Sequence, residues 1–120
     1  SDGEQQEGSI WEAVMSAAHH QLGNLIVIVD CNRLQIDGPV KDVMNIEPLA
    51  DKYRAFGWDV LEVNGHDMAN LVENLEAARS RPTVGRPVAL ICRTNKGRGW
   101  RWRSRVPRAC HPPPRSWRWA

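Results

Sequence analysis

Residues 25–30, LIVIVD, form a short run of aliphatic, mostly β-branched side chains that ends on an aspartate. Such an uninterrupted apolar run is typical of a strand buried on both faces, which occurs mainly in parallel sheets. Two later runs, WDVLEV (residues 58–63) and PVALICRT (residues 87–94), have the same character. Because the segments between them are long enough for crossover helices, we predict an α/β fold with an open, mostly parallel sheet and flanking helices.

Helical patterns separate these predicted strands. Residues 9–12, SIWE, match a capping box, and apolar residues recur at helical spacing over residues 11–22. A second helix is predicted over residues 47–56, with Pro48 in its first turn. Asp67 is placed to cap a third helix. We expect Met68, Leu71, Leu75 and Ala78 to form the buried stripe of that third helix.

Charge divides the chain into two parts. Residues 1–97 hold all 14 acidic residues and nine of the 16 basic ones, for a net charge of −5. Residues 98–120 hold seven arginines and no acidic residue, for a net charge of +7. We therefore predict a folded domain over residues 1–99 and a separate basic tail over residues 100–120.

The tail, WRWRSRVPRACHPPPRSWRWA, contains four of the six tryptophans and four of the eight prolines, without any apolar periodicity. We expect it to be disordered, because it has too little apolar surface to offset the entropy of ordering. One explanation for its composition is translation of GC-rich sequence in the wrong frame. The alternative is a basic, aromatic segment that binds nucleic acid or an anionic surface, because arginine neutralises phosphate and tryptophan stacks on bases.

Three scattered cysteines, Cys31, Cys92 and Cys110, do not form a disulfide framework. No signal peptide is recognisable, and no apolar run approaches the roughly 20 residues of a membrane span. We expect a reducing, cytoplasmic setting and no membrane partner.

Polar residues occur where the predicted sheet would bind a ligand. Asp2 and Gly3 precede the first helix, and Asn32 follows the strand after it, 30 residues later (32 − 2). In open α/β sheets, ligands bind outside the carboxyl ends of the strands. Asp2, the amide of Asn32 and the backbone carbonyl of Leu34 are oxygen donors suited to Mg²⁺. From spacing alone the signal is weak, because an Asp-Gly pair before a helix is more often an ordinary turn.

The stretch SDGEQQEGSIWEAVMSAAHHQLGNLIVIVDCNRLQIDG (residues 1–38) resembles the thiamine diphosphate motif of transketolases, which begins Gly-Asp-Gly and ends near an asparagine after the next strand. EGSIWEA and DCNRLQIDG are more similar to transketolase than to pyruvate dehydrogenase or deoxyxylulose-phosphate synthase. IEPLADKYRAFGWDVLEVNGHD and TNKGRG extend the resemblance to about residues 1–99. Ser1 stands where the first glycine of the motif is expected. The resemblance implies an incomplete thiamine-diphosphate-binding fold.

The resemblance also implies thiamine diphosphate and Mg²⁺ as cofactors. Asp2 and Asn32 correspond to the side-chain Mg²⁺ ligands of the family, and the carbonyl of Leu34 corresponds to the third protein ligand. The backbone of Gly3 and the side chain of Asn32 would contact the diphosphate, and Ile36 would pack near the cofactor.

Glu7 and Glu12 match family carboxylates near the subunit interface, which are proposed to relay protons between paired cofactor sites. For Glu12, the capping box is a second explanation, and both stay open. Glu7 has no comparable structural role.

By resemblance, the chain is part of an enzyme of the pentose phosphate pathway that transfers a two-carbon ketol unit from a ketose phosphate to an aldose phosphate. Its expected partners are the pyrimidine-binding domain or C-terminal subunit of a transketolase, in a homodimeric assembly. Because each cofactor site needs that second part, we expect this chain alone to be inactive. The alternatives are a non-catalytic fragment or basic-tailed binding protein, and another thiamine diphosphate enzyme such as deoxyxylulose-phosphate synthase.

Overall fold

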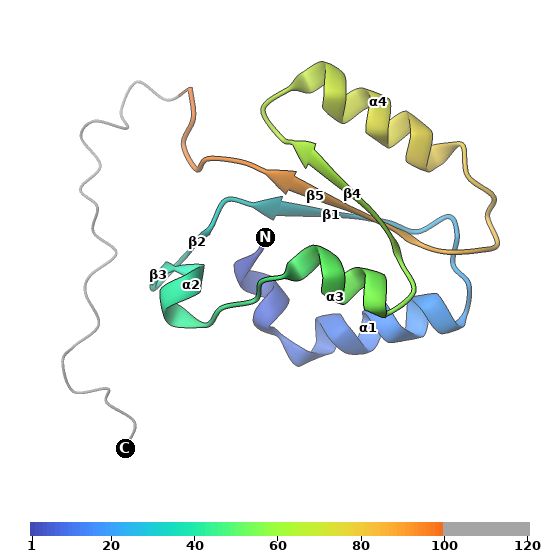
Figure 1. Cartoon of the computed structure of the whole chain (residues 1–120), viewed down its shortest axis with the longest axis horizontal. Coiled ribbons are helices and arrows are strands. Elements are labelled where there is room, and N and C mark those ends of the chain that lie inside the picture. Colours follow the sequence, from blue (N-terminus) through green and yellow to red (C-terminus); the bar gives the residue numbers. More distant parts are fainter. Residues whose placement is uncertain (100–120) are drawn as a thin grey trace.

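The central sheet contains three parallel strands (Figure 1) in a computed structural model that describes residues 1–99. They are β1 (Ile26–Cys31), β4 (Asp59–Asn64) and β5 (Val88–Arg93), in the order β1-β5-β4. β5 pairs in parallel with both neighbours. The predicted α/β architecture with a parallel sheet is confirmed, whereas the predictions for the tail concern residues outside the described part.

The strand that is buried on both faces is β5, in which Val88, Ala89, Leu90 and Ile91 have no exposed surface. Within residues 1–99, β1 pairs only with β5 and lies at an edge of the sheet. Ile28 of β1 is consequently 55% exposed. Our prediction that residues 25–30 are buried on both faces was therefore wrong, because burial follows the order of strands in the sheet and not only the apolar character of one strand.

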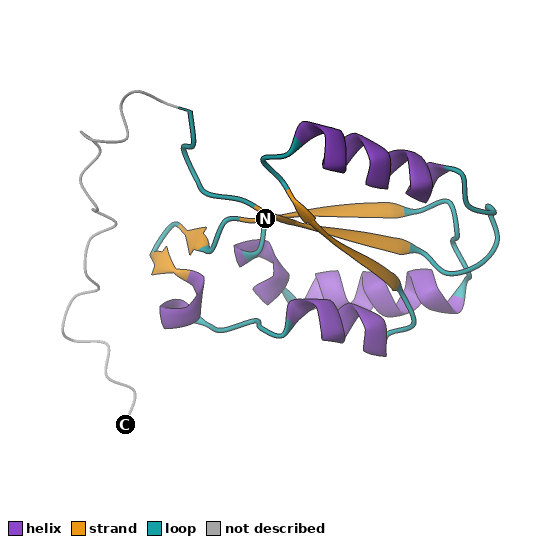
Figure 2. Ribbon diagram, turned by 45° about the horizontal axis from the view of Figure 1, so that its top comes forward, coloured by secondary structure: helices purple, strands orange, loops and turns teal. Residues whose placement is uncertain are grey.

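Helices cover the two faces of the sheet unequally (Figure 2). α1 (Gly8–His19) and α3 (Leu49–Ala55) pack on one face, where Tyr53 and Trp58 are fully buried. The indole nitrogen of Trp58 donates to the carbonyl of Val14 at 2.9 Å, which joins the end of α3 to α1. α4 (Met68–Arg79) covers the other face, around Val63 and Leu90. The prediction that Met68 is buried there was wrong: it is the first residue of α4 and is 67% exposed.

The start of α1 differs from the prediction. A short 3-10 helix, η1 (Gly3–Gln6), comes first, and Glu7 then takes an extended conformation at the N-cap of α1 without a side-chain capping bond. Ser9 and Glu12 therefore lie inside the helix, and the predicted capping box was wrong because η1 makes the helix begin before Ser9. Asp67, by contrast, caps α4 as predicted, accepting from the amide of Asn70 at 3.1 Å.

Three small elements after β1 were not predicted. β2 (Leu34–Gln35) and β3 (Gly38–Pro39) form an antiparallel hairpin, and α2 (Val40–Val43) follows directly. Gly38 has a φ of +139°, a conformation that side chains with a Cβ rarely adopt. These elements project beyond the carboxyl end of β1 (Figure 1). Pro39, Val40 and Lys41 from β3 and α2 line the cavity described below.

α1 and α4 have 12 residues each. Over residues 1–99, neither they nor the shorter helices have the length and apolar composition needed to cross a membrane.

Candidate functional site

The Asp2 carboxylate lies at the carboxyl end of β1. The amide of Asp2 donates to the carbonyl of Asp30 at 3.1 Å, which ties the start of the chain to that strand. The side chain is 2% exposed. Its two oxygens accept from the amides of Gly3 at 3.0 Å and Arg33 at 2.6 Å. The structure therefore places Asp2 against the residue that follows Asn32, as the strand-end prediction requires.

Both the oxygen and the nitrogen of the Asn32 side-chain amide form hydrogen bonds. Its oxygen accepts from the amide of Leu34 at 3.0 Å, and its nitrogen donates to the Asp30 carboxylate at 3.0 Å. The hydroxyl of Thr94 also donates to Asp30. The hydroxyl bond lowers the pKa of Asp30, outweighing partial burial, and the Asn32 bond adds to it. The Asn32 side chain is thus oriented at the strand end before any ligand arrives.

Arg33 has a φ of +65°, in the left-handed region that costs a non-glycine residue about 1 kcal/mol. This conformation points the Arg33 amide at Asp2, while the Arg33 carbonyl accepts from the amide of Val40 at 3.1 Å. Sequence reasoning missed Arg33, because an arginine carries no local signal for this conformation.

The residues present fit a bound cation. Within residues 1–99, no lysine, arginine or histidine side chain forms an ion pair with the buried carboxylate of Asp2, whose hydrogen-bond donors are the backbone amides of Gly3 and Arg33. In the same part of the chain, three or more His, Cys, Asp or Glu side chains nowhere gather as a metal site. A cation here would therefore need the oxygens of Asn32 and Leu34 as well, a donor set that suits Mg²⁺.

Gly3 has a packing role that the sequence did not reveal. A Cβ on Gly3 would lie 2.9 Å from the Cβ of Gln35 in β2, so a larger residue would push the hairpin away. The amide of Gly3 already donates to Asp2. A contact between Gly3 and a diphosphate therefore stays a prediction.

The other predicted residues lie on the surface. Ile36, in the turn between β2 and β3, is 90% exposed. Glu7 and Glu12 are exposed at the start and within the second turn of α1. Because Glu12 has no capping role, the structural explanation for it is removed. The described residues alone do not bring these two glutamates to the Asp2 carboxylate.

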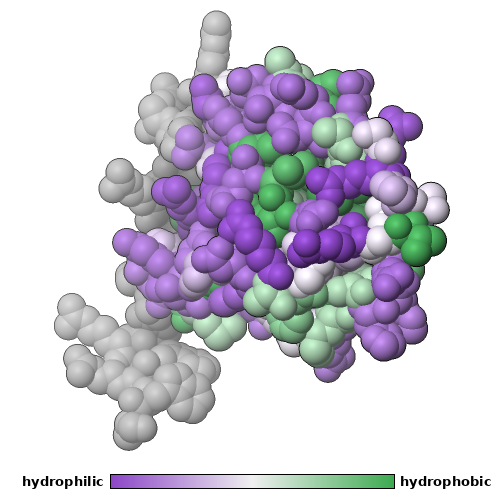
Figure 3. All heavy atoms as spheres, turned by 45° about the vertical axis from the view of Figure 1, so that its right-hand side comes forward, coloured by the Kyte–Doolittle hydropathy of each residue, from purple (hydrophilic) through white to green (hydrophobic). Residues whose placement is uncertain are grey.

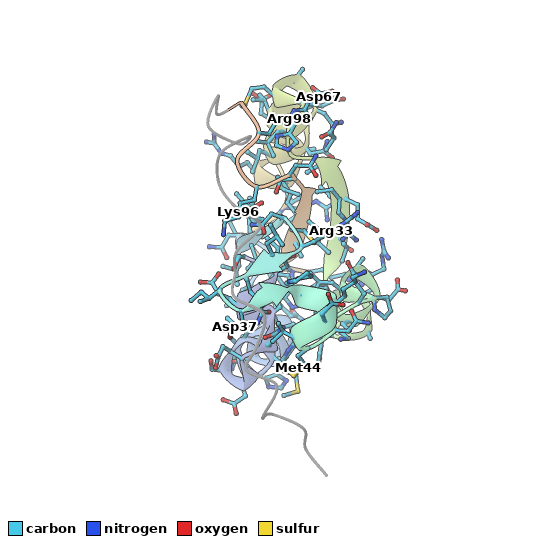
Figure 4. The ribbon with its side chains drawn as sticks, turned by 90° about the vertical axis from the view of Figure 1, so that its left-hand side faces the viewer. Arg33, Asp37, Met44, Asp67, Lys96 and Arg98 are labelled. Carbon is cyan, nitrogen blue, oxygen red and sulfur yellow. The ribbon has the colours of Figure 1, made fainter. Side chains whose placement is uncertain are left out.

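Figure 4 looks onto the carboxyl edge of the sheet, where loops from separate elements gather. Arg33 and Asp37 follow β1, Lys96 and Arg98 follow β5, and Asp67 precedes α4. Ligand-binding residues on an open α/β sheet come from loops at this edge.

A cavity of about 630 Å³ opens beside Asp2. It is lined by Asp2, Arg33, Pro39, Val40, Lys41, Asn45, Ile46, Glu47 and Arg93. Arg93 donates to Glu47 at 2.6 Å, to Glu62 at 3.2 Å and to the sulfur of Cys31 at 3.1 Å. The Glu47 bond raises the pKa of Arg93, so this cation is fixed on the cavity wall.

Known proteins similar to this chain identify its family. Residues 1–108 match the family described as transketolase, thiamine diphosphate binding domain. The chain belongs to this transketolase family. Its relatives include an apulose-4-phosphate transketolase subunit of Phocaeicola vulgatus, which is 46% identical over 98 residues, and human transketolase, which is 38% identical over 98 residues.

The transketolase match covers 82% of this chain in both relatives, but only 34% of the Phocaeicola protein and 15% of the human protein. The chain thus spans about a third of the length of the Phocaeicola relative. Solved transketolases have the same fold. The Leishmania mexicana enzyme is 36% identical with a TM-score of 0.70 over 78% of this chain, and the Campylobacter jejuni enzyme is 34% identical with a TM-score of 0.64 over 73%. These matches cover 14% of each of those chains.

Proposed function

We propose that this chain binds thiamine diphosphate with Mg²⁺ at the carboxyl edge of its sheet, as the diphosphate-binding part of a transketolase. The observation that carries the proposal is the buried Asp2 carboxylate, which has no basic side-chain partner within residues 1–99 and lies at the end of β1. Membership of the transketolase family supports the same ligand.

In this proposal, Asp2, the Asn32 side chain and the Leu34 carbonyl hold the Mg²⁺. The Gly3 backbone and Asn32 contact the diphosphate, and the exposed Ile36 packs near the cofactor. When bound, thiamine diphosphate supplies the carbanion that takes up and donates a carbon unit. The chain's own residues bind and orient it.

The reaction proposed for the whole protein is transfer of a two-carbon ketol unit from a ketose phosphate to an aldose phosphate, in the cytoplasm and in the pentose phosphate pathway. Two relatives are named as transketolase subunits for apulose-4-phosphate and 6-deoxy-6-sulfo-D-fructose. The proposed partner is therefore a second transketolase subunit or domain, within a homodimer. Glu7 and Glu12, both exposed on α1, would contribute interface carboxylates. The isolated chain is proposed to be inactive.

Calorimetry with the full chain tests the cofactor proposal. Thiamine diphosphate is titrated with and without Mg²⁺, alone and with the remainder of a transketolase supplied as a separate chain. We expect Mg²⁺-dependent binding that weakens by about tenfold or more in Asp2→Asn, because a neutral amide loses the charge that holds the cation.

Asp42→Asn is the matched control, since Asp42 is an exposed carboxylate in α2. It should bind as the unsubstituted chain does. Binding of thiamine diphosphate that does not depend on Mg²⁺ would contradict the proposed site. So would an affinity in Asp2→Asn equal to that of the unsubstituted chain.

A further inference from the structure

Gln5 is a buried polar residue next to the candidate cation site, and it is 6% exposed. Its amide donates to the carbonyl of Asp2 at 3.0 Å, and its carbonyl accepts from the indole of Trp11 at 2.8 Å. Its side-chain nitrogen donates to the carbonyl of Ser1 at 3.3 Å, and its side-chain oxygen accepts from the hydroxyl of Tyr53 at 2.8 Å. Gln5 therefore joins both ends of the turn around Asp2 to the helical layer.

Tyr53 gives this connection a fixed anchor. It belongs to α3, lies 48 residues from Gln5 and is fully buried. Its ring contacts Trp11 and Trp58, with centroid distances of 5.6 and 5.4 Å. Burial raises the pKa of Tyr53 to about 12, so the hydroxyl is protonated at neutral pH and is available to donate.

We propose that Gln5 and Tyr53 are positioning residues for the cation site, which hold the Asp2–Gly3 turn against α3 and so set the carboxylate of Asp2 for Mg²⁺. The inference rests on the proposed function and extends it to two residues that touch neither metal nor diphosphate. The four-residue helix η1 is too short to hold its own orientation, because such short turns depend on tertiary contacts. The Gln5–Tyr53 bond supplies that contact from the most deeply buried part of the core.

The polar character of the pair is informative. Two apolar side chains of similar size would fill the same space, and replacing both partners of a buried hydrogen bond in this way can be almost neutral for stability. Unlike apolar contacts, a hydrogen bond depends on the relative orientation of its two groups and so fixes that orientation. The hydrogen bond between Gln5 and Tyr53 therefore contributes more to the orientation of the turn than to the stability of the fold.

Tyr53→Phe in the full chain removes only the hydroxyl and tests this role. Hydrogen exchange of the amides of Gly3 and Arg33, the two donors to Asp2, is measured by NMR without cofactor. We expect exchange about fivefold faster and Mg²⁺-dependent thiamine diphosphate affinity about fivefold weaker, the factor for one lost hydrogen bond.

Val63→Ala is the matched control, because Val63 is buried on the α4 face and belongs to a different core cluster. It should lower overall stability without changing these two amides beyond that global effect, and without changing Mg²⁺-dependent affinity. A merely structural role of Tyr53 would make both variants behave alike.

Gln5→Leu alone gives a second test if Tyr53→Phe fails to fold, with the same expected loss of affinity. The Gln5→Leu/Tyr53→Phe double variant gives a further test when both single variants fold. Because both changes break the same Gln5–Tyr53 bond, the effect of the double variant on affinity should be smaller than the sum of the single effects. Unchanged affinity and unchanged amide exchange in Tyr53→Phe, beside binding by the unsubstituted chain, would overturn the positioning role alone. No Mg²⁺-dependent binding by the unsubstituted chain would overturn the proposed function, and this inference with it.

Discussion

On one face of the sheet, α1 and α3 bury Tyr53 and Trp58 against β1 and β5, whereas on the other face α4 leaves Ile28 of β1 55% exposed. Asp2 is bound to the first face through Gln5 and Tyr53. Figure 3 shows apolar patches that remain at the surface among hydrophilic side chains. The candidate site is therefore supported by the more completely packed face. Substitutions on the α4 face should affect binding at the site less than substitutions on the α1/α3 face.

The largest expected effect is that of Trp58→Ala on the α1/α3 face. Trp58 is fully buried and its indole also donates to the carbonyl of Val14, so its removal leaves a cavity and breaks a buried hydrogen bond. We expect a loss of about 3–5 kcal/mol in the free energy of unfolding, measured by urea denaturation. Val63→Ala on the α4 face should cost about 2 kcal/mol. Equal losses of stability in the two variants would contradict the conclusion that the α1/α3 face is more completely packed than the α4 face.

A smaller effect is expected at the cap of α4. Asp67→Ala removes the acceptor of the Asn70 amide and should cost about 1 kcal/mol in thermal or urea unfolding. Asp67→Asn, which retains a capping oxygen, is the control and should stay close to the unsubstituted chain. Because α4 lies on the face opposite Asp2, neither variant should alter Mg²⁺-dependent binding. A change in binding would show that the two faces are coupled.

The smallest expected effect is the contribution of Glu47, just before α3, to the pH dependence of the free energy of unfolding. Partial burial acts to raise the pKa of Glu47, but bonds from the Leu49 amide and Arg93 outweigh it and lower this pKa from its ordinary 4.5. A lowered folded-state pKa stabilises the fold above the unfolded-state value, and this contribution is lost as pH falls through the folded-state pKa.

Urea unfolding at about pH 6 and about pH 3.5 measures this loss. The difference in stability between the two values should be smaller in Glu47→Gln than in the unsubstituted chain. Glu73→Gln, on the exposed surface of α4, is the control and should keep the full difference. If the difference in stability between the two pH values is the same in Glu47→Gln as in the unsubstituted chain, Glu47 does not contribute to the loss of stability in acid.

The parallel sheet and the α4 cap could be predicted because their signals are local: continuous β-branched runs, and an aspartate three residues before its amide donor. The burial of β1 could not, since it depends on which strand lies beside it. The capping box predicted at residues 9–12 was wrong for a comparable reason. The short helix η1 determines where α1 begins, and the sequence pattern gives no sign of η1.

For the candidate site, strand-end spacing was sufficient to place Asp2 beside the segment that contains Asn32, although their cofactor roles remain proposals. The left-handed backbone of Arg33 and the contact between Gln5 and Tyr53 could not be anticipated. The first depends on a conformation unusual for arginine, and the second joins residues 48 positions apart. Both result from tertiary structure, which no local pattern encodes.

The close approach of Gly3 to Gln35 has an evolutionary consequence. Since a Cβ at position 3 would lie 2.9 Å from the Cβ at position 35, a residue other than glycine at position 3 requires β2 to move or position 35 to lose its own Cβ. A residue larger than glycine at position 3 would displace β2, which carries Leu34, and thereby disturb a proposed metal ligand 31 positions away (34 − 3). If Leu34 has the proposed role, selection on it would constrain Gly3, and we expect epistasis between positions 3 and 35 among sequences that share this hairpin.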